Sequence, residues 1–280
     1  MKIAISAEST IDLTKELLKE FDIHTIPFTF ELNSKEYTDG DLTNPEMFEI
    51  VDKTGKLPKT ASINVARYTD YFKSILDEGY DGIVHISLSS GISSTSSNAI
   101  IASREFENVK IVDSESLSTG IALLAIKGAK LAKEGKELNE IVNTLNETVS
   151  KVQASFILHN IKYLYKGGRC SLLALLSSTA LNIRPQIIVD KGKMYPGDKY
   201  FGNYNRCVAK YCESTLKKFD NPDKSLAFVT YSSIDNREMA EICINALKEA
   251  GFERILETTA GSTIACHCGE MCIGILYIRK

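Results

Sequence analysis

The segment GIVHISLSSGISSTSSNAIIASREF, residues 82–106, contains one complete unit of the fold. Gly82 to Leu88 form a short apolar run, which predicts a buried strand. Ser96 to Phe106 carry apolar residues at helical spacing and predict a helix. The stretch between them therefore predicts a loop that leads from the end of a strand into a helix.

The same alternation of strands and helices is found on both sides of this unit. Alternating strands and helices indicate a mainly parallel sheet with helices on its faces. We therefore expect an α/β fold class for an N-terminal domain over residues 1–153. The further strands predicted in it are Lys2–Ser6 and Val109–Val112, and the helices are Asp12–Phe21, Tyr68–Glu78, Ser118–Glu134 and Leu138–Val152.

The pattern changes near residue 153. The second part mixes strand–strand and strand–helix units, which predicts a separate α+β layered domain over residues 154–280. The strands expected there are Phe156–Leu158, Ile187–Val189, Ala227–Tyr231, Arg254–Glu257 and Gly274–Ile278, and the helices are Leu172–Leu181, Arg206–Lys218 and Asn236–Ala250.

Composition narrows the class of protein. The formal net charge is -3 and the pI about 5.9, which argues against nucleic-acid binding, because phosphate contacts need clustered Lys and Arg. No apolar run reaches the roughly 18 residues that a membrane-spanning helix needs. The N-terminus meets Glu8 and Asp12 before a secretory apolar stretch could form, so we expect no signal peptide and a cytoplasmic protein.

Seven cysteines suggest free thiols rather than a disulfide framework, because their number is odd and no export signal is expected. Cys266, Cys268 and Cys272 surround His267, but their spacing does not match a zinc site. We expect no metal. We expect instead a strand in which small buried side chains flank one functional histidine.

The loop at residues 89–97 is a candidate anion site, because seven of its nine residues carry hydroxyl groups. Ligands of open α/β sheets bind at the carboxyl ends of strands, where loops enter helices. Two other loops have the same character: Pro58–Ser62 and Asp113–Ser116. Serine and threonine before a helix also serve as ordinary N-caps. Seven hydroxyls exceed what capping requires.

Two further segments contribute nitrogen groups. Arg169 follows a Gly167-Gly168 turn, and His267 precedes the last predicted strand. The guanidinium fork of arginine suits a carboxylate or phosphate, and histidine donates or accepts a proton near neutral pH. A lone arginine, however, is more often solvated at the surface, and a lone histidine is more often buried without a function.

At this point the sequence resembles the DegV family. The resemblance rests on short ordered motifs that span almost the whole chain. These are Ser9–Leu13, Glu36–Gly40, Lys59-Thr60, Ile92–Thr95, Val112–Ser114, Leu164–Arg169, Leu181–Pro185 and His267–Gly269.

The resemblance implies a two-domain protein that binds a long-chain fatty acid between its domains, as the binding subunit of the bacterial fatty-acid kinase does in phospholipid metabolism. It implies that Thr60 and Ser93 hydrogen-bond the carboxylate and that Arg169 and His267 complete the polar network. Ser62, Ser94 and Thr95 are secondary candidates from the same motifs.

A fatty acid requires an apolar tunnel with a few polar groups at one end. The apolar helices over Ile121–Leu131 and Leu172–Leu181 are candidates for that tunnel. The chain lacks the phosphate-binding sequence Gly-x-x-x-x-Gly-Lys-Ser/Thr. We therefore expect the nucleotide to be bound by a separate ATP-binding kinase subunit, and this chain to be a carrier without catalytic residues or a cofactor.

Two other functions stay open at this stage. The chain could be a serine hydrolase that uses Ser93 as nucleophile and His267 as base. Against this, Ser90–Ser94 does not match the Gly-x-Ser-x-Gly sequence of the nucleophile elbow. The chain could also be a regulatory sensor of another small amphiphile.

Overall fold

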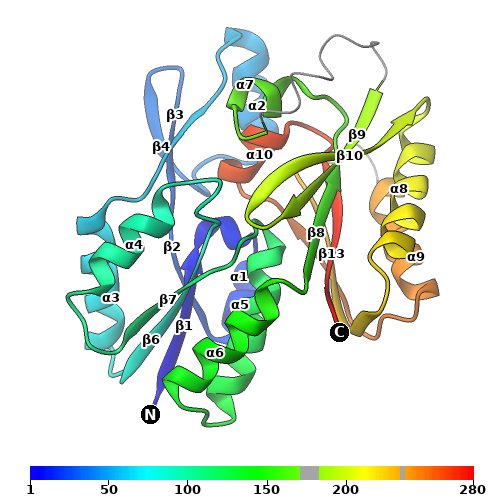
Figure 1. Cartoon of the computed structure of the whole chain (residues 1–280). Helices are drawn as coiled ribbons and strands as arrows, with labels where there is room; N and C mark the ends of the chain where they lie inside the picture. The colour runs from blue at the N-terminus through cyan, green and yellow to red at the C-terminus, as the bar shows by residue number, and fades with distance from the viewer. Residues whose placement is uncertain (171–182, 234–236) are drawn as a thin grey trace.

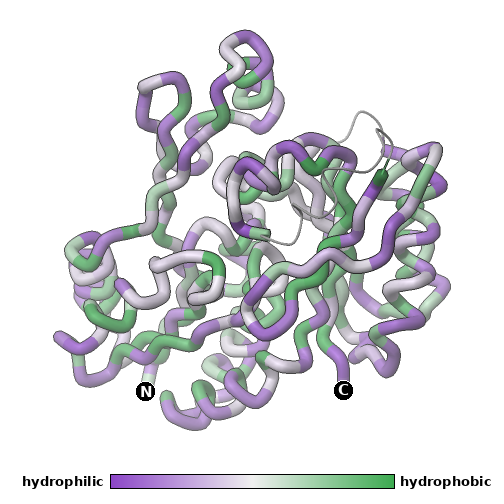
Figure 2. Tube along the Cα trace, turned by 45° about the horizontal axis from the view of Figure 1, so that its top comes forward, coloured by the Kyte–Doolittle hydropathy of each residue, from purple (hydrophilic) through white to green (hydrophobic). Residues whose placement is uncertain are grey.

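The structure is a computed structural model that describes residues 1–170, 183–233 and 237–280. Its three sheets and the surrounding helices are shown in Figure 1. Figure 2 shows that hydrophobic residues gather along the strands, whereas hydrophilic and hydrophobic residues alternate along the outer helices. No helix of the described residues is long and apolar enough to cross a membrane.

The first sheet is parallel throughout and has the strand order β2-β1-β6-β7. Its two central strands are buried on both faces, because helices cover both sides of the sheet. Helices α3 and α4 lie on one side, and α5 and α6 on the other (Figure 1). The bounds are β1 Ile3–Glu8, β2 Ile23–Ile26, β6 Gly82–Ser87, β7 Val109–Asp113, α3 Val65–Asp77, α4 Thr95–Ser103, α5 Thr119–Lys133 and α6 Leu138–Val149.

The second sheet is mixed and has the order β10-β9-β8-β13-β11-β12. Only its β11–β12 pair is parallel among these neighbours. Helices α8 and α9 cover one face. The bounds are β8 Val152–Ile157, β9 Ile183–Asp190, β10 Lys193–Phe201, β11 Pro222–Tyr231, β12 Ile255–Thr259, β13 Ile273–Arg279, α8 Tyr204–Lys218 and α9 Glu238–Glu249.

Helix α5 lies between the two large sheets. It contacts β1 and β6 of the first sheet and β8, β11 and β13 of the second. Every residue from Thr119 to Ile126 is buried. A helix that is apolar on all sides needs such an enclosed position. One hydrophobic core therefore extends from the first sheet through α5 to the second.

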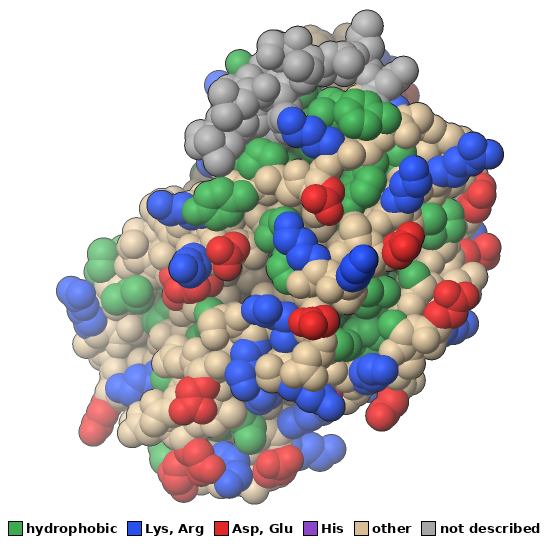
Figure 3. All heavy atoms as spheres, turned by 45° about the vertical axis from the view of Figure 1, so that its right-hand side comes forward, with side chains coloured by type: hydrophobic (Ala, Val, Ile, Leu, Met, Phe, Trp, Pro, Cys, Tyr) green, Lys and Arg blue, Asp and Glu red, His purple; other side chains and the backbone are tan. Residues whose placement is uncertain are grey.

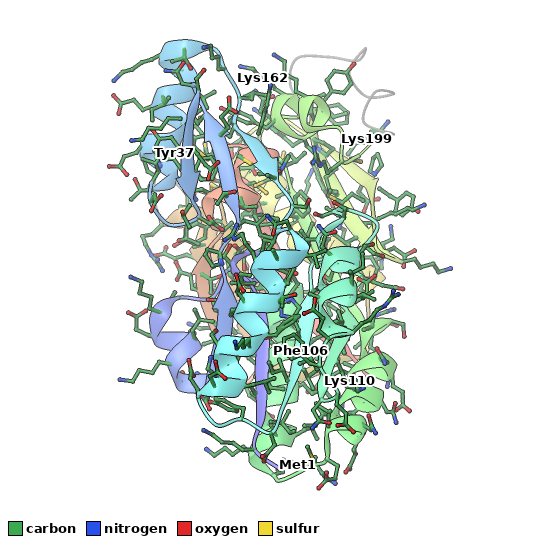
Figure 4. The ribbon with its side chains drawn as sticks, turned by 90° about the vertical axis from the view of Figure 1, so that its left-hand side faces the viewer. Met1, Tyr37, Phe106, Lys110, Lys162 and Lys199 are labelled. Carbon is green, nitrogen blue, oxygen red and sulfur yellow. The ribbon has the colours of Figure 1, made fainter. Side chains whose placement is uncertain are left out.

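A small antiparallel sheet, with the order β4-β3-β5, lies at the end of the molecule opposite the N-terminus. Figure 4 shows Tyr37 of β4 and Lys162 of α7 at this end and Met1 at the other. The aromatic side chains of Phe48 and Tyr163 pack edge to face here. The bounds are β3 Thr29–Leu32, β4 Lys35–Thr38, β5 Lys59–Ala61, α2 Asn44–Thr54, α7 Lys162–Gly167 and α10 Ser262–Cys268; α1 Lys15–Phe21 and the 3-10 turn η1 Ser9–Ile11 complete the fold.

The side chains of β13 alternate between two environments. Ile273, Ile275 and Tyr277 pack beneath α8 and α9. Gly274 and Leu276 face the opposite side, toward α5 and a cavity. Because successive strand residues point to opposite faces, one strand serves both the core and the cavity.

The predicted fold class, a parallel α/β part followed by a mixed sheet with helices, is confirmed. The domain boundary at residue 153 stays a prediction. The expected strand around His267 is wrong, because Ser262–Cys268 form helix α10. The expected Leu172–Leu181 helix lies outside the described residues, as does the first residue of the expected Asn236–Ala250 helix.

Candidate functional site

A cavity of about 500 Å³ lies between the carboxyl ends of the first sheet and one face of the second. The first part of the chain contributes the turns after β1, β6 and β7, and the second part contributes β8, β10, β11, β13 and α10. Most of the wall is apolar. Its larger apolar side chains include Phe28, Leu88, Phe156, Leu164, Met194 and Leu276.

Gly274 forms a flat part of the wall in the middle of β13. A Cβ at this position would lie 2.5 Å from the Ser155 carbonyl oxygen and 3.1 Å from the Phe156 Cβ. Any larger residue would therefore have to displace strand β8.

The Ile121–Leu131 stretch, expected to line the tunnel, is not part of the wall, because α5 packs between the sheets. Leu117 and Ser118, which precede α5, line the cavity instead.

The four predicted site residues all line this one cavity, although they lie far apart in the sequence. Thr60 comes from β5, Ser93 from the loop after β6, Arg169 from the turn after α7 and His267 from the last turn of α10. What they do there stays a prediction.

The secondary candidates divide into two groups. Ser62 and Ser94 line the cavity and are exposed, as Arg169 is, so these three residues mark its mouth. Thr95 is fully buried and is not part of the cavity wall. Its hydroxyl oxygen lies 2.7 Å from the Tyr68 hydroxyl instead.

His267 and Thr60 form the central contact of the polar end. The His267 Nε2 lies 3.0 Å from the Thr60 Oγ1. Burial, and then the positive charge of Arg169, lower the pKa of His267 to about 4. The imidazole is therefore neutral at physiological pH. Gly167 packs against the ring, and a Cβ there would lie 2.7 Å from the His267 Nδ1.

Arg169 brings a positive charge to the mouth. Its Nη1 donates a hydrogen bond of 2.6 Å to the Gly167 carbonyl oxygen. Since Gly167 also contacts His267, the glycine turn fixes the cation and the imidazole relative to each other. The other guanidinium nitrogens can contact an anion at the mouth.

A buried carboxylate binds the start of the loop that carries Ser93. Glu8, at the end of β1, accepts a 2.8 Å hydrogen bond from the Leu88 backbone N–H and a 2.6 Å bond from the Tyr68 hydroxyl. Burial raises the pKa of Glu8, but His85, Tyr68 and the Leu88 N–H outweigh it, so the pKa is lowered overall. The start of the loop is thereby fixed by an ionised side chain.

Ser93 is oriented by its own loop. Its backbone N–H donates to the Ser89 carbonyl oxygen, and its Oγ accepts a 3.2 Å hydrogen bond from the Thr95 N–H. The hydroxyl hydrogen stays available for an acceptor in the cavity.

The hydrolase alternative needs a Ser93–His267 pair, and the hydrogen bonds of these described residues do not include one. His267 contacts Thr60, and the Ser93 hydroxyl oxygen accepts from the Thr95 N–H.

The described residues contain no group of three or more His, Cys, Asp or Glu side chains placed to hold a metal ion. The three cysteines around His267 are buried.

Sequence reasoning missed part of the wall. Thr10, Ser118, Thr230 and Thr263 also line the cavity. Thr263 lies four residues before His267, so both face the same side of α10. This signal was hidden because the segment was expected to be a strand.

The chain is similar to known proteins over its whole length. The family model described as "Uncharacterised protein, DegV family" matches residues 2–280. A DegV domain-containing protein from Clostridium acetobutylicum is 30% identical over 285 residues, which cover 100% of this chain and 99% of the relative.

Solved structures are similar as well. The structure of DegV from Bacillus subtilis, described as a fatty acid binding protein, is 26% identical with a TM-score of 0.85 and 100% coverage of both chains. A DegV family protein from Thermus thermophilus, whose structure is described in terms of fatty acid binding, has a TM-score of 0.91 with 21% identity and 100% coverage of both chains. The second likeness concerns the fold alone.

Proposed function

The chain belongs to the DegV family, and from this membership and the cavity we propose that it binds a long-chain fatty acid and presents the carboxylate to a separate ATP-dependent kinase subunit. In this proposal the chain is a carrier, needs no cofactor of its own and works in the cytoplasm. The partner makes the acyl phosphate.

The observation that carries the proposal is the polarity of the cavity. An apolar interior of about 500 Å³ has a cationic and hydroxyl-rich mouth, which matches a ligand with one charged head and a long tail. Burial of each CH₂ group contributes about 0.8 kcal/mol, so the tail supplies most of the affinity. The head group then sets the direction in which the ligand enters.

The polar residues have complementary roles in this proposal. Arg169 supplies the positive charge, and Thr60 and Ser93 donate hydroxyl hydrogen bonds to the carboxylate oxygens. His267 orients Thr60 through their 3.0 Å contact. Ser62 and Ser94 lie beside the head group at the mouth.

Presentation to a kinase requires that the carboxylate stays accessible. The exposed positions of Ser62, Ser94 and Arg169 support this, because they place the polar end of the cavity at the surface. A carboxylate is ionised at neutral pH and can attack a phosphoryl group without losing a proton first. The same donors would stabilise the added negative charge of an acyl phosphate.

The test is a binding titration with hexadecanoic acid. We expect Arg169→Gln and Thr60→Val to weaken binding by about tenfold each, as for the loss of a hydrogen bond to a charged group. Arg254→Gln is the matched control, because Arg254 pairs with Glu20 and does not line the cavity. Equal affinity in all four proteins would remove both residues from the head-group site.

The kinase step needs its own assay. With a fatty-acid kinase subunit and ATP, acyl phosphate should form only when this chain is present. Cleavage of p-nitrophenyl esters by the chain alone would instead favour the hydrolase alternative. Recovery of a different amphiphile from the purified protein by mass spectrometry would favour a sensor.

A further inference from the structure

Two buried threonines of the cavity wall have hydroxyl groups without a partner. Thr10 is 0% exposed and Thr263 is 4% exposed. Neither Oγ1 makes a hydrogen bond to any described residue. Both residues line the same cavity as the head-group candidates.

The carboxylate of Asp39 joins the two segments that carry these threonines. Asp39 accepts a 2.7 Å hydrogen bond from the Ser9 hydroxyl through one oxygen and a 3.3 Å bond from the Thr263 N–H through the other. Ser9 is the chain neighbour of Thr10. The turn after β1 and the first turn of α10 are therefore joined at this point.

The pair lies deeper than the mouth residues. Thr263 and His267 are one turn apart on α10, which corresponds to an axial rise of about 6 Å. The mouth residues Ser94 and Arg169 are exposed, whereas both threonines are buried. An acyl chain that is bound with its carboxylate at the mouth therefore passes the threonines a few carbons below that carboxylate.

The other buried hydroxyls on this wall have partners within the protein. The Thr230 Oγ1 lies 2.7 Å from the Thr119 Oγ1 and 3.0 Å from the Thr258 Oγ1. The Ser118 hydroxyl donates to the Asp12 carboxylate. Since buried polar groups in folded proteins nearly always have partners, we expect a ligand atom or a water molecule to bond the two unpaired hydroxyls.

We propose that the preferred ligand is a fatty acid with a second oxygen near its carboxyl end, either a hydroxyl or a carbonyl group, which hydrogen-bonds Thr10 and Thr263. This inference rests on the proposed fatty-acid function. A plain alkyl chain leaves both hydroxyls unpaired, whereas a hydroxyl group donates to one threonine and accepts from the other.

The test compares four ligands of equal length by calorimetric titration. Hexadecanoic acid is the reference, the 3-hydroxy and 5-hydroxy acids carry the second oxygen near the head, and 16-hydroxyhexadecanoic acid carries it at the far end. At least one of the two head-proximal hydroxy acids should bind about 3- to 10-fold more tightly than hexadecanoic acid, the range for one hydrogen bond. The 16-hydroxy acid should gain nothing.

The variants Thr10→Val and Thr263→Val keep the side-chain shape and remove the hydroxyl. Each should lose most of this preference, measured within the same variant as the ratio of its affinities for the hydroxy acid and for hexadecanoic acid. Thr148→Val is the matched control, because Thr148 is buried, bonds the Thr144 carbonyl oxygen and lies outside the cavity wall. It should keep the preference.

The possible failures are distinguishable. If hexadecanoic acid and both head-proximal hydroxy acids bind the unmodified protein equally, ordered water satisfies the threonines and this inference is wrong, while the fatty-acid function stands. A preference for the 16-hydroxy acid also overturns it. If none of the four acids binds, the proposed function itself fails. These ligand comparisons decide the matter even if a valine variant does not fold.

Discussion

His267 allows a quantitative test of the site before any ligand is added. Its pKa in the folded protein is about 4, against 6.5 for an unperturbed histidine, first because of burial and second because of Arg169. The unfolded chain therefore binds a proton more readily than the folded one between these values. The stability contributed by the neutral imidazole is fully present above pH 6.5 and is lost as the pH falls toward 4.

The two pKa values set the size of the effect. Between pH 7.5 and pH 5 the free energy of unfolding should fall by about 2 kcal/mol at most through this residue. Partial solvent access of the ring makes the true value smaller. His267→Gln removes the titrating group, so its stability should not include this fall.

The assay is urea unfolding of both proteins at several pH values. The stability difference between the unmodified protein and His267→Gln should shrink as the pH falls, and the change should be smaller in an Arg169→Gln background. Parallel curves for the two proteins from pH 7.5 to pH 5 would refute the assignment of a buried neutral imidazole at the mouth of the cavity.

Three other changes test the site and the core. Gly167→Ala should push the His267 ring away and weaken hexadecanoic acid binding several-fold with little loss of stability, because the new Cβ would lie 2.7 Å from Nδ1; unchanged binding contradicts this. Gly274→Val should lower the free energy of unfolding by about 1–3 kcal/mol through overpacking against Ser155, measured by urea unfolding; an unchanged midpoint contradicts it. All seven cysteines are buried, so iodoacetamide should label them only after unfolding, and rapid native labelling counted by mass spectrometry contradicts that.

The sequence predicted the strands and helices of residues 82–134 closely, because each of these elements has its own apolar pattern. Gly82–Ser87 ends one residue before the expected strand does, and Thr119–Lys133 is shorter than the expected helix by one residue at each end. The least accurate bound is the end of Thr95–Ser103, which comes three residues before the expected end. The small sheet around β5 was not predicted. Its strands have only three or four residues, and among them only β3 alternates buried with less buried side chains, so the pattern is too short to indicate a strand.

Helix α10 shows a different limit of sequence reasoning. Its seven residues include three small apolar side chains near His267, and so short a run fits a strand or a helix equally well. Its first turn is fixed by distant side chains: Asp12 accepts from the Gly261 N–H and Asp39 from the Thr263 N–H. Contacts over more than 200 residues of sequence leave no local signal.

The surface carries less information about partners than the cavity does. Figure 3 shows Lys and Arg side chains interspersed with Asp and Glu on the face it presents. Mixed charge of this kind favours solubility and does not identify a partner. The proposed kinase partner is therefore better sought through the exposed residues at the mouth, Ser62, Ser94 and Arg169, than through charge alone.

The cavity depends on contacts between the two large parts of the chain. Asn44, which begins α2, donates hydrogen bonds of 2.6 and 2.7 Å to the carbonyl oxygens of Ser232 and Ala260. Ala260 directly precedes the turn that starts α10, and α10 carries both Thr263 and His267. The first part of the chain therefore sets the position of a helix that lines the cavity from the second part. Because Thr263 and His267 lie on one helix, any shift of α10 must move both side chains together.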